Sequence, residues 1–187
     1  MAILEVHNLK KIYTTRFGGN QVQALADLNF SVEKGEMMAL LGPNGAGKTT
    51  TLKLLSGILY PTSGEVLVNG FVPWERKNEF KRTFAIVMGQ KNQLWWDLPA
   101  SDSLYLNKCI YDVDDREYKK TVDELSELLG VRELMNIQVR RLSLGERMKM
   151  EILAALIHRP GILFLDEPTI GLDIVSQQKI RDFLHYY

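Results

Sequence analysis

Eight consecutive residues in the first third of the chain have the spacing of a phosphate-binding loop. They read Gly42-Pro43-Asn44-Gly45-Ala46-Gly47-Lys48-Thr49 and match the P-loop pattern GxxxxGK[ST]. Glycines let successive backbone N–H groups converge on phosphate oxygens, where a side chain would intrude. The Lys48 ammonium suits the β and γ phosphates of a nucleotide, and the Thr49 hydroxyl can ligate Mg²⁺. The pattern therefore predicts a binding site for ATP with magnesium.

The elements around this pattern favour a phosphate site over its alternative, a chance glycine turn. The apolar run Met37–Leu41 precedes the loop and does not alternate with polar residues, which predicts a strand covered on both faces. From about Lys48 the apolar residues Leu52, Leu55 and Leu59 predict one face of a helix. A strand, a glycine-rich turn and a helix are the context that the pattern requires.

Two carboxylates supply groups that nucleotide hydrolysis would need. Asp166 and Glu167 follow the apolar segment Gly161–Leu165, which predicts a buried strand. Open α/β sheets bind ligands at the carboxyl ends of their strands. Strand alternation would point the two side chains in different directions, so Asp166 could hold the magnesium shell while Glu167 polarises the attacking water. The alternative is that the two acids begin a solvated loop.

The order of expected strands and helices along the rest of the chain predicts an α/β fold. Alternation at Leu4–Val6 and Leu28–Val32 indicates antiparallel strands near the N-terminus, and Phe84–Met88 indicates another buried strand. Helical periodicity covers about 102–129, and Ser143 predicts the N-cap of a helix that reaches about 158. We expect one domain over residues 1–187, with a mainly parallel sheet, an N-terminal antiparallel β subdomain and an inserted helical subdomain at about 91–158.

Composition narrows the functional class. Lys plus Arg and Asp plus Glu both number 23, so the chain lacks the basic surplus typical of nucleic-acid binding, although a local basic patch stays open. The single Cys109 fits a reducing compartment. No apolar run approaches the roughly 18 to 20 residues that span a bilayer, so we expect any membrane contact to go through a partner.

Further motifs give the chain a resemblance to ATP-binding cassette (ABC) proteins, which are P-loop NTPases. The segment Leu142-Ser143-Leu144-Gly145-Glu146 resembles their signature sequence, LSGGQ, and Pro168–Asp173 resembles their D-loop. Gln90 matches their Q-loop glutamine, and Tyr13 stands where the family places an aromatic that stacks on adenine. The resemblance covers the whole chain. Two residues differ from the signature LSGGQ: Leu144 replaces its first glycine, and Glu146 replaces its glutamine.

The resemblance implies roles for particular residues. The nucleotide-binding positions would be Tyr13, Gly42, Pro43, Asn44, Gly45, Ala46, Gly47, Lys48, Thr49, Thr50, Ser143, Gly145, Glu146 and Asp173. The catalytic positions would be Glu167, Gln90 and Lys48, and the metal positions Thr49, Gln90 and Asp166. Ser143 and Gly145 would contact the γ-phosphate held by the other subunit of a head-to-tail dimer. The alternatives are an ordinary helix cap for Ser143, a polar strand end for Gln90 and an edge-strand aromatic covering the core for Tyr13.

The same resemblance implies an ATPase that powers transport. The partners would be a second ATP-binding subunit, as a homodimer, and a transmembrane permease subunit, with the chain cytoplasmic and peripheral on the inner face of the cell membrane. Residues 89–96 also resemble ATPases of ABC-2-type exporters, which implies export. Trp95–Pro99 could form the groove for a coupling helix of the permease or pack within the helical subdomain. The rival functions are a hydrolysis-deficient nucleotide-binding fragment and a soluble ABC-type ATPase that acts on ribosomes or DNA.

The C-terminal part of the chain predicts an incomplete domain. The family's switch histidine should lie a helix and a strand beyond Asp173, and His185 is too close to Asp173 to be it. A central strand between Met37–Leu41 and Gly161–Leu165 would then also be missing. We therefore expect weak stability and little ATPase activity from these 187 residues alone.

Overall fold

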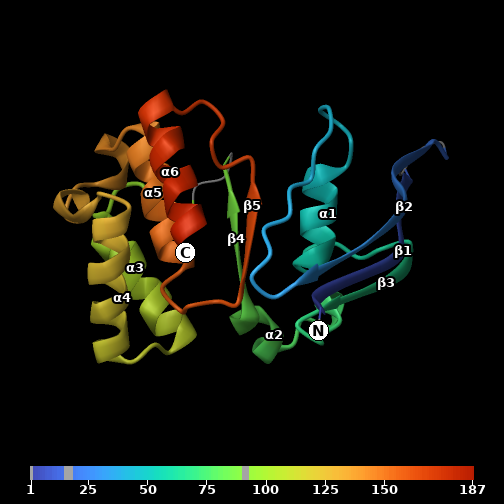
Figure 1. The fold of residues 1–187 in the computed structure, drawn as a ribbon, viewed down its shortest axis with the longest axis horizontal. Helices are drawn as coiled ribbons and strands as arrows, with labels where there is room; N and C mark the ends of the chain where they lie inside the picture. The colour runs from blue at the N-terminus through green and yellow to red at the C-terminus, as the bar shows by residue number, and fades with distance from the viewer. Residues whose placement is uncertain (1, 15–18, 90–92) are drawn as a thin grey trace. The chain divides into compact units, whose positions relative to one another are not determined.

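The computed structural model describes residues 2–14, 19–89 and 93–187 (Figure 1). They form two compact units, Met1–Phe84 and Ala85–Tyr187, and each unit is described by itself. The expected single domain with a helical subdomain at about 91–158 stays a prediction.

An antiparallel sheet of three strands forms much of the N-terminal unit. The strands β1 (Ala2–Thr14), β2 (Gln21–Glu33) and β3 (Ser63–Val68) lie in the order β2-β1-β3, and both neighbouring pairs are antiparallel. Leu4 and Val6 of the central strand are buried, as their alternation with polar residues predicts. The two antiparallel strands expected near the N-terminus are thus confirmed.

Helix α1 (Lys48–Leu55) contacts β2 and a 3-10 turn at Pro73–Glu75, and the short helix α2 (Asn78–Thr83) follows. Apolar side chains from the sheet and these helices form the core of the unit. The most deeply buried of them are Leu4, Val6, Leu9, Leu54, Leu55, Val66, Val68 and Phe80. Removing a large side chain of this kind from water contributes about 1.5 to 3 kcal/mol.

Residues 37–41 contradict the sequence prediction. The structure has no strand there, and Met37 and Met38 are exposed, as is Leu41, which is 92 % accessible to solvent. Apolar content favours a strand only where a neighbouring strand completes its hydrogen-bond ladder. The described sheet of this unit consists of β2, β1 and β3, so it offers residues 37–41 no place. The apolar composition predicted the strand, but no described strand of this unit pairs with these residues.

The described part of the C-terminal unit combines two strands with four α-helices and two short 3-10 helices. Strands β4 (Phe84–Met88) and β5 (Ile162–Asp166) are hydrogen-bonded neighbours, and their arrows run in the same direction in Figure 1. The helices are α3 (Ala100–Tyr111), α4 (Asp115–Leu128), α5 (Leu144–Ala155) and α6 (Ile174–Tyr186). The helical stretch expected at 102–129 is therefore two helices. The break comes at Asp112, whose φ of 55° ends α3 in the left-handed conformation.

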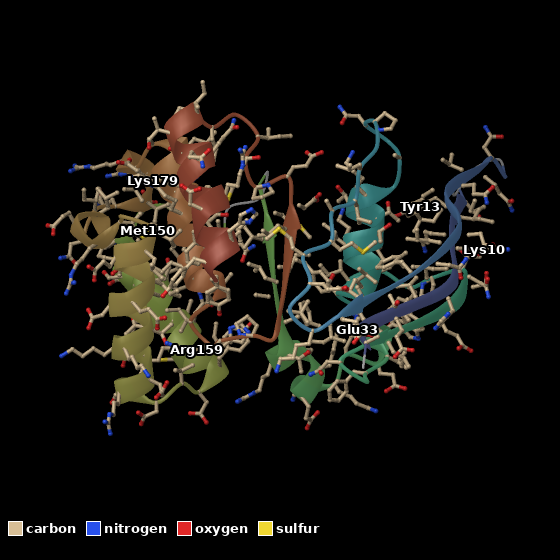
Figure 2. All side chains as sticks on the ribbon, in the orientation of Figure 1. Lys10, Tyr13, Glu33, Met150, Arg159 and Lys179 are labelled. Carbon is tan, nitrogen blue, oxygen red and sulfur yellow. The ribbon has the colours of Figure 1, made fainter. Side chains whose placement is uncertain are left out.

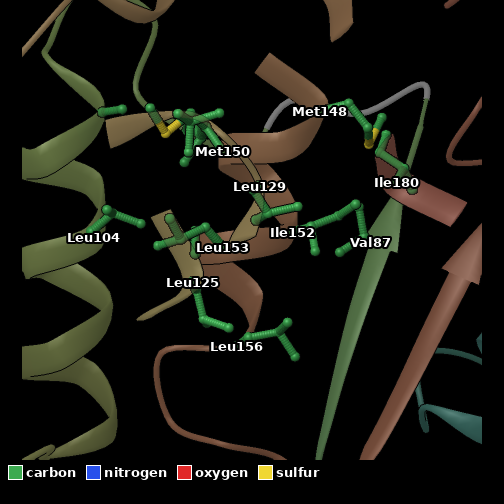
Figure 3. Close-up of a cluster of buried hydrophobic side chains, with 14 of the residues drawn as sticks. Val87, Leu104, Leu125, Leu129, Met148, Met150, Ile152, Leu153, Leu156 and Ile180 are labelled. Atoms are coloured by element: carbon green, nitrogen blue, oxygen red, sulfur yellow. The ribbon is translucent and has the colours of Figure 1, made fainter. Parts of the chain in front are cut away.

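Helix α5 is the centre of this unit, because it contacts α3, α4 and α6. Its residues Met150, Ile152 and Leu153 are fully buried among apolar side chains of the neighbouring elements (Figure 3). Those neighbours include Val87 of β4, Leu104 of α3, Leu125 of α4 and Ile180 of α6. Because α5 begins at Ser143, its burial fixes the position of the signature-like segment in this unit.

Candidate functional site

The phosphate-binding loop of the N-terminal unit depends on two glycines with positive φ. Gly45 has φ 84° and Gly47, the N-cap of α1, has φ 89°, values that side chains rarely adopt. A Cβ atom at Gly47 would also lie 2.6 Å from the Ala24 carbonyl oxygen and 2.7 Å from Leu25 Cδ2 on β2. Gly47 is therefore required both by its backbone conformation and by the close approach of β2.

Lys48 turns its ammonium group back into this loop. Its Nζ donates hydrogen bonds to the carbonyl oxygens of Gly42 at 2.9 Å and Pro43 at 3.0 Å. The loop residues 42–46 are exposed, and Lys48 begins α1, so the positive end of the helix and the ammonium group lie in one accessible region. Such an arrangement attracts an anion with several oxygens, such as the phosphates of a nucleotide.

Tyr13 belongs to the same unit and lies near the end of β1 (Figure 2). It pairs with Val22 of β2, and the Lys11 ammonium lies 5.2 Å from the centre of its ring. The ring is 41 % exposed, so it is not a core residue. This exposure favours the predicted stacking role over core packing, but adenine stacking itself stays a prediction.

The two carboxylates lie at the end of strand β5 in the C-terminal unit, as predicted. Asp166 is the last residue of β5, and its carbonyl accepts a hydrogen bond of 3.0 Å from the Gly89 N–H. Glu167 has φ 53°, a left-handed conformation that is costly for a residue with a side chain. A Cβ atom at Gly89 would lie 2.5 Å from the Glu167 carbonyl oxygen, so only glycine allows this approach. Gly89 is a supporting residue that sequence reasoning missed, although a glycine at a strand end signals close backbone contact.

Ser143 and Glu146 form a capping box at the start of α5. The Ser143 N–H donates to Glu146 Oε2 at 2.8 Å, and the Glu146 N–H donates to Ser143 Oγ at 3.3 Å. The hydrogen bond from the Ser143 N–H holds the pKa of the Glu146 carboxyl below its ordinary value. Glu146 is thus ionised and engaged in the cap, which gives a structural reason for a carboxylate at this position.

The D-loop residue Asp173 lies beside this cap. Its side chain caps α6 by accepting a hydrogen bond of 2.9 Å from the Ser176 N–H, and hydrogen bonds from Ser176 lower the pKa of the Asp173 carboxyl. A Cβ atom at Gly145 would lie 2.7 Å from Ser176 Cβ. The predicted Ser143, Gly145, Glu146 and Asp173 are therefore brought together, through a contact with Ser176 that the sequence did not reveal.

Leu144 replaces a glycine of the family signature and makes a contact of its own. A Cβ atom at Gly171 would lie 3.2 Å from Leu144 Cδ2, so the leucine packs against the loop that precedes α6. This departure from the signature therefore adds packing between the start of α5 and the D-loop segment.

Gln90 lies outside the described residues. The described residues nearest to it in sequence are Gly89 and Gln93: Gly89 contacts the end of β5, and the Gln93 side chain donates a hydrogen bond of 2.8 Å from Nε2 to the Ile86 carbonyl of β4. The N-terminal unit thus carries Tyr13 and the phosphate loop, while the carboxylates, signature-like segment and Asp173 belong to the C-terminal unit.

Comparison with known proteins decides the family. Residues 25–170 match the protein family described as ABC transporter. The chain belongs to this family. It is 37 % identical to the ABC transporter ATP-binding protein NatA of Bacillus subtilis over 163 residues, which cover 87 % of this chain and 66 % of NatA. It is 33 % identical to the bacitracin transport ATP-binding protein BcrA of Bacillus licheniformis, covering 98 % of this chain and 56 % of BcrA.

Solved structures of family members confirm the fold class. The structure of an ATP-binding subunit of an ABC transporter matches this chain with a TM-score of 0.84 and 28 % sequence identity. The match covers 98 % of this chain and 74 % of that chain. The dimeric post-hydrolysis structure of the ATP-binding cassette MJ0796, bound to ADP and Pi, matches this chain with a TM-score of 0.82 and 26 % sequence identity. The match covers 97 % of this chain and 81 % of the MJ0796 chain. The P-loop NTPase fold expected from the motifs is thereby confirmed.

This chain spans about two thirds or less of the length of NatA and BcrA. Among its described residues, no helix is both long and apolar enough to cross a membrane.

Proposed function

We propose that this chain binds ATP with Mg²⁺ and hydrolyses it, and that a separate transmembrane permease subunit uses the cycle to export a substrate. The phosphate loop carries the proposal. Its left-handed glycines, the start of α1 and the Lys48 ammonium offer hydrogen-bond donors and positive charge in one exposed place. These residues fit the triphosphate of ATP, and the exposed ring of Tyr13 suits a base.

The proposed magnesium site uses hard oxygen donors. The Thr49 hydroxyl, the Asp166 carboxylate and the Gln90 amide oxygen are the kinds of ligand that Mg²⁺ prefers. Bound Mg²⁺ would neutralise charge on the phosphate oxygens. Glu167 would accept a proton from the attacking water.

A second copy of the chain would complete the site. The start of α5 exposes Ser143, whose hydroxyl suits a phosphate held by the partner copy, and the buried Gly145 follows it in the first turn. The similarity to the dimeric MJ0796 cassette supports this arrangement. Similarity to NatA, an ABC transporter ATP-binding protein, and to BcrA, a bacitracin transport ATP-binding protein, supports transport. A permease partner would hold the chain at the inner face of the cell membrane.

Replacing Lys48 tests the central claim. In Lys48→Ala, we expect the dissociation constant for ATP with magnesium to rise about 10- to 100-fold, because a hydrogen bond to a charged group contributes roughly 1.5 to 3 kcal/mol. Titration calorimetry measures this constant. The matched control is Lys53→Ala on the last turn of the same helix, which should bind ATP as the unchanged chain does. Equal affinity of all three chains would contradict the proposal.

The transport claim needs a separate test. The proposal expects a gene for a membrane protein next to that of this chain, and the two proteins, expressed together, should copurify in detergent. ATP turnover should then change when the membrane protein is present. Tight ATP binding without any association would separate nucleotide binding from transport and would favour a soluble ATPase.

A further inference from the structure

The chain contains the pair Asn-Gly twice, and the two pairs lie in different settings. Asn44-Gly45 belongs to the phosphate loop, and Asn69-Gly70 follows strand β3. Both pairs are exposed to solvent. An asparagine followed by glycine is prone to deamidation, because glycine has no side chain that shields its backbone nitrogen from the asparagine side chain. The sequence treats the two pairs alike, whereas the structure distinguishes them.

The Asn69-Gly70 pair is held in a tight turn. Asn69 has φ 49° and Gly70 has φ 77°, the two positive values of a type I′ hairpin turn. The Val68 N–H donates to the Phe71 carbonyl at 2.9 Å, and the Phe71 N–H donates to the Val68 carbonyl at 3.0 Å. The Asn69 N–H donates a third bond, of 2.7 Å, to the Ile3 carbonyl of β1. Ring closure at Asn69 requires a rotation of the backbone that these three bonds oppose.

The Asn44-Gly45 pair is held by fewer contacts. One turn bond crosses it, from the Ala46 N–H to the Pro43 carbonyl at 3.2 Å. Among the described residues, neither the Asn44 side chain nor the Gly45 N–H has a hydrogen-bond partner. A Cβ atom at Gly45 would meet nothing within 4 Å, so no atom crowds the glycine on that side. The Asn44 side chain can therefore approach the Gly45 nitrogen at less cost than the corresponding groups of the other pair.

The phosphate loop also offers the electrostatic environment that deamidation needs. The attacking group is the Gly45 nitrogen after it has lost its proton, and negative charge moves onto the Asn44 side-chain oxygen in the transition state. The Lys48 ammonium, held at the Gly42 and Pro43 carbonyls, and the start of α1 place positive charge in the same loop. Fixed positive charge stabilises developing negative charge. The field that attracts phosphate thus also favours this reaction.

We propose that Asn44 is a site of spontaneous deamidation and that a bound nucleotide protects it. The Gly45 nitrogen gives its proton to water and attacks the Asn44 Cγ atom. The new C–N bond closes a five-membered succinimide, and the side-chain nitrogen takes up a proton and leaves as ammonia. One water molecule then opens the ring at either carbonyl, which leaves aspartate or isoaspartate at position 44. The steps together consume one water and release one ammonia, without any redox change.

Either product damages the phosphate loop. The new carboxylate places a negative charge where the phosphates would bind, and isoaspartate also lengthens the loop backbone by one methylene group. Repulsion between like charges should raise the dissociation constant for ATP with magnesium by about 10-fold or more. Protection rests on the proposed function, because phosphates that accept hydrogen bonds from the loop N–H groups hold the Gly45 nitrogen away from Asn44. A chain occupied by nucleotide thus loses its site more slowly than an empty one.

The two Asn-Gly pairs are compared within one sample. The folded chain is incubated at mildly alkaline pH without nucleotide, and peptide mapping by mass spectrometry follows both asparagines. We expect Asn44 to react at least about 10-fold faster than Asn69, because two additional hydrogen bonds hold the Asn69 turn. Equal rates, or a faster reaction at Asn69, would overturn the assignment. In urea the two rates should become similar; an unchanged ratio would trace the difference to the flanking residues and would also overturn it.

Nucleotide supplies the second reading. At a concentration about ten times its dissociation constant, ATP with magnesium should slow the reaction at Asn44 about 10-fold, because only the empty chain reacts. Adenosine, which lacks phosphates, is the control and should not protect Asn44. If titration calorimetry shows that ATP binds and Asn44 still reacts at its full rate, the proposed protection is wrong. If ATP does not bind, the proposed function fails, and the comparison without nucleotide still decides the deamidation site.

Two substitutions link the modification to binding. Asn44→Gln keeps an amide but would have to close a six-membered ring, which forms much more slowly. After long incubation this variant should keep the ATP affinity that it has at the start, whereas the unchanged chain should lose about 10-fold. Asn69→Gly suits the same hairpin turn and is the matched control, which should lose affinity as the unchanged chain does. Full affinity of the unchanged chain after complete reaction at Asn44 would contradict the damage.

Discussion

The two units build their functional segments in different ways. In the N-terminal unit the phosphate loop is one continuous stretch, held by backbone conformations at Gly45 and Gly47 and by Lys48 bonding to its own loop. In the C-terminal unit the segment at Ser143–Glu146 depends on Ser176, about thirty residues later in the chain. The phosphate loop is thus one segment with a single close approach to β2 at Gly47, whereas the signature-like segment requires α5 and α6 to be packed together.

This contrast extends to chemistry. The phosphate loop contributes positive charge and N–H donors, which suit binding. The C-terminal unit contributes the acceptor Glu167, which suits proton transfer. Variants in the two units should therefore affect different steps of the same reaction.

The largest expected effect separates hydrolysis from binding. In an intact, full-length version of the protein, Glu167→Gln should lower ATP turnover by about 10² or more, because it removes a general base, while the dissociation constant for ATP stays unchanged. Steady-state kinetics and titration calorimetry on the same preparation measure both. Glu133→Gln, an exposed residue of the same unit, is the control. Turnover near that of the unchanged chain would show that another group activates the water.

The next effect tests how locally the phosphate loop is encoded. Gly47→Ala should lower the free energy of unfolding by about 2 to 5 kcal/mol, because a left-handed backbone costs about 1 to 2 and overpacking against Ala24 about 1 to 3. Gly45→Ala has the same kind of backbone conformation but nothing within 4 Å of the added Cβ, so about 1 to 2 kcal/mol is expected. Urea unfolding compares the two. Equal losses would show that contact with β2 does not constrain the loop.

The sequence predicted the phosphate loop because its eight residues carry their own geometry. It also predicted the Ser143 cap, strand β4 and the Asp166–Glu167 strand end, since short-range patterns specify each of them. Residues 37–41 show the limit of such patterns. Their apolar character predicted a strand, but a strand requires a pairing partner, which composition does not specify.

Residues that support the site through distant contacts escaped prediction. Gly89 and Ser176 matter because they approach Glu167 and Gly145, which lie far away in the sequence. Glu151 of α5 is also buried, because other helices cover α5. Its burial depends on the tertiary packing of α5, which helical periodicity alone does not reveal.

The smallest expected effect probes the long-range contact in the C-terminal unit. Gly145→Ala should lower the free energy of unfolding by about 1 to 3 kcal/mol, because the added Cβ would meet the Ser176 side chain. Ser176→Gly removes that side chain, so the double variant should lose less than the sum of the two single variants. Unfolding of all four chains gives the interaction energy, which we expect to be at least about 0.5 kcal/mol in favour of the double variant. Simple additivity would show that Gly145 is not constrained by α6, and the signature-like segment would then be as locally encoded as the phosphate loop.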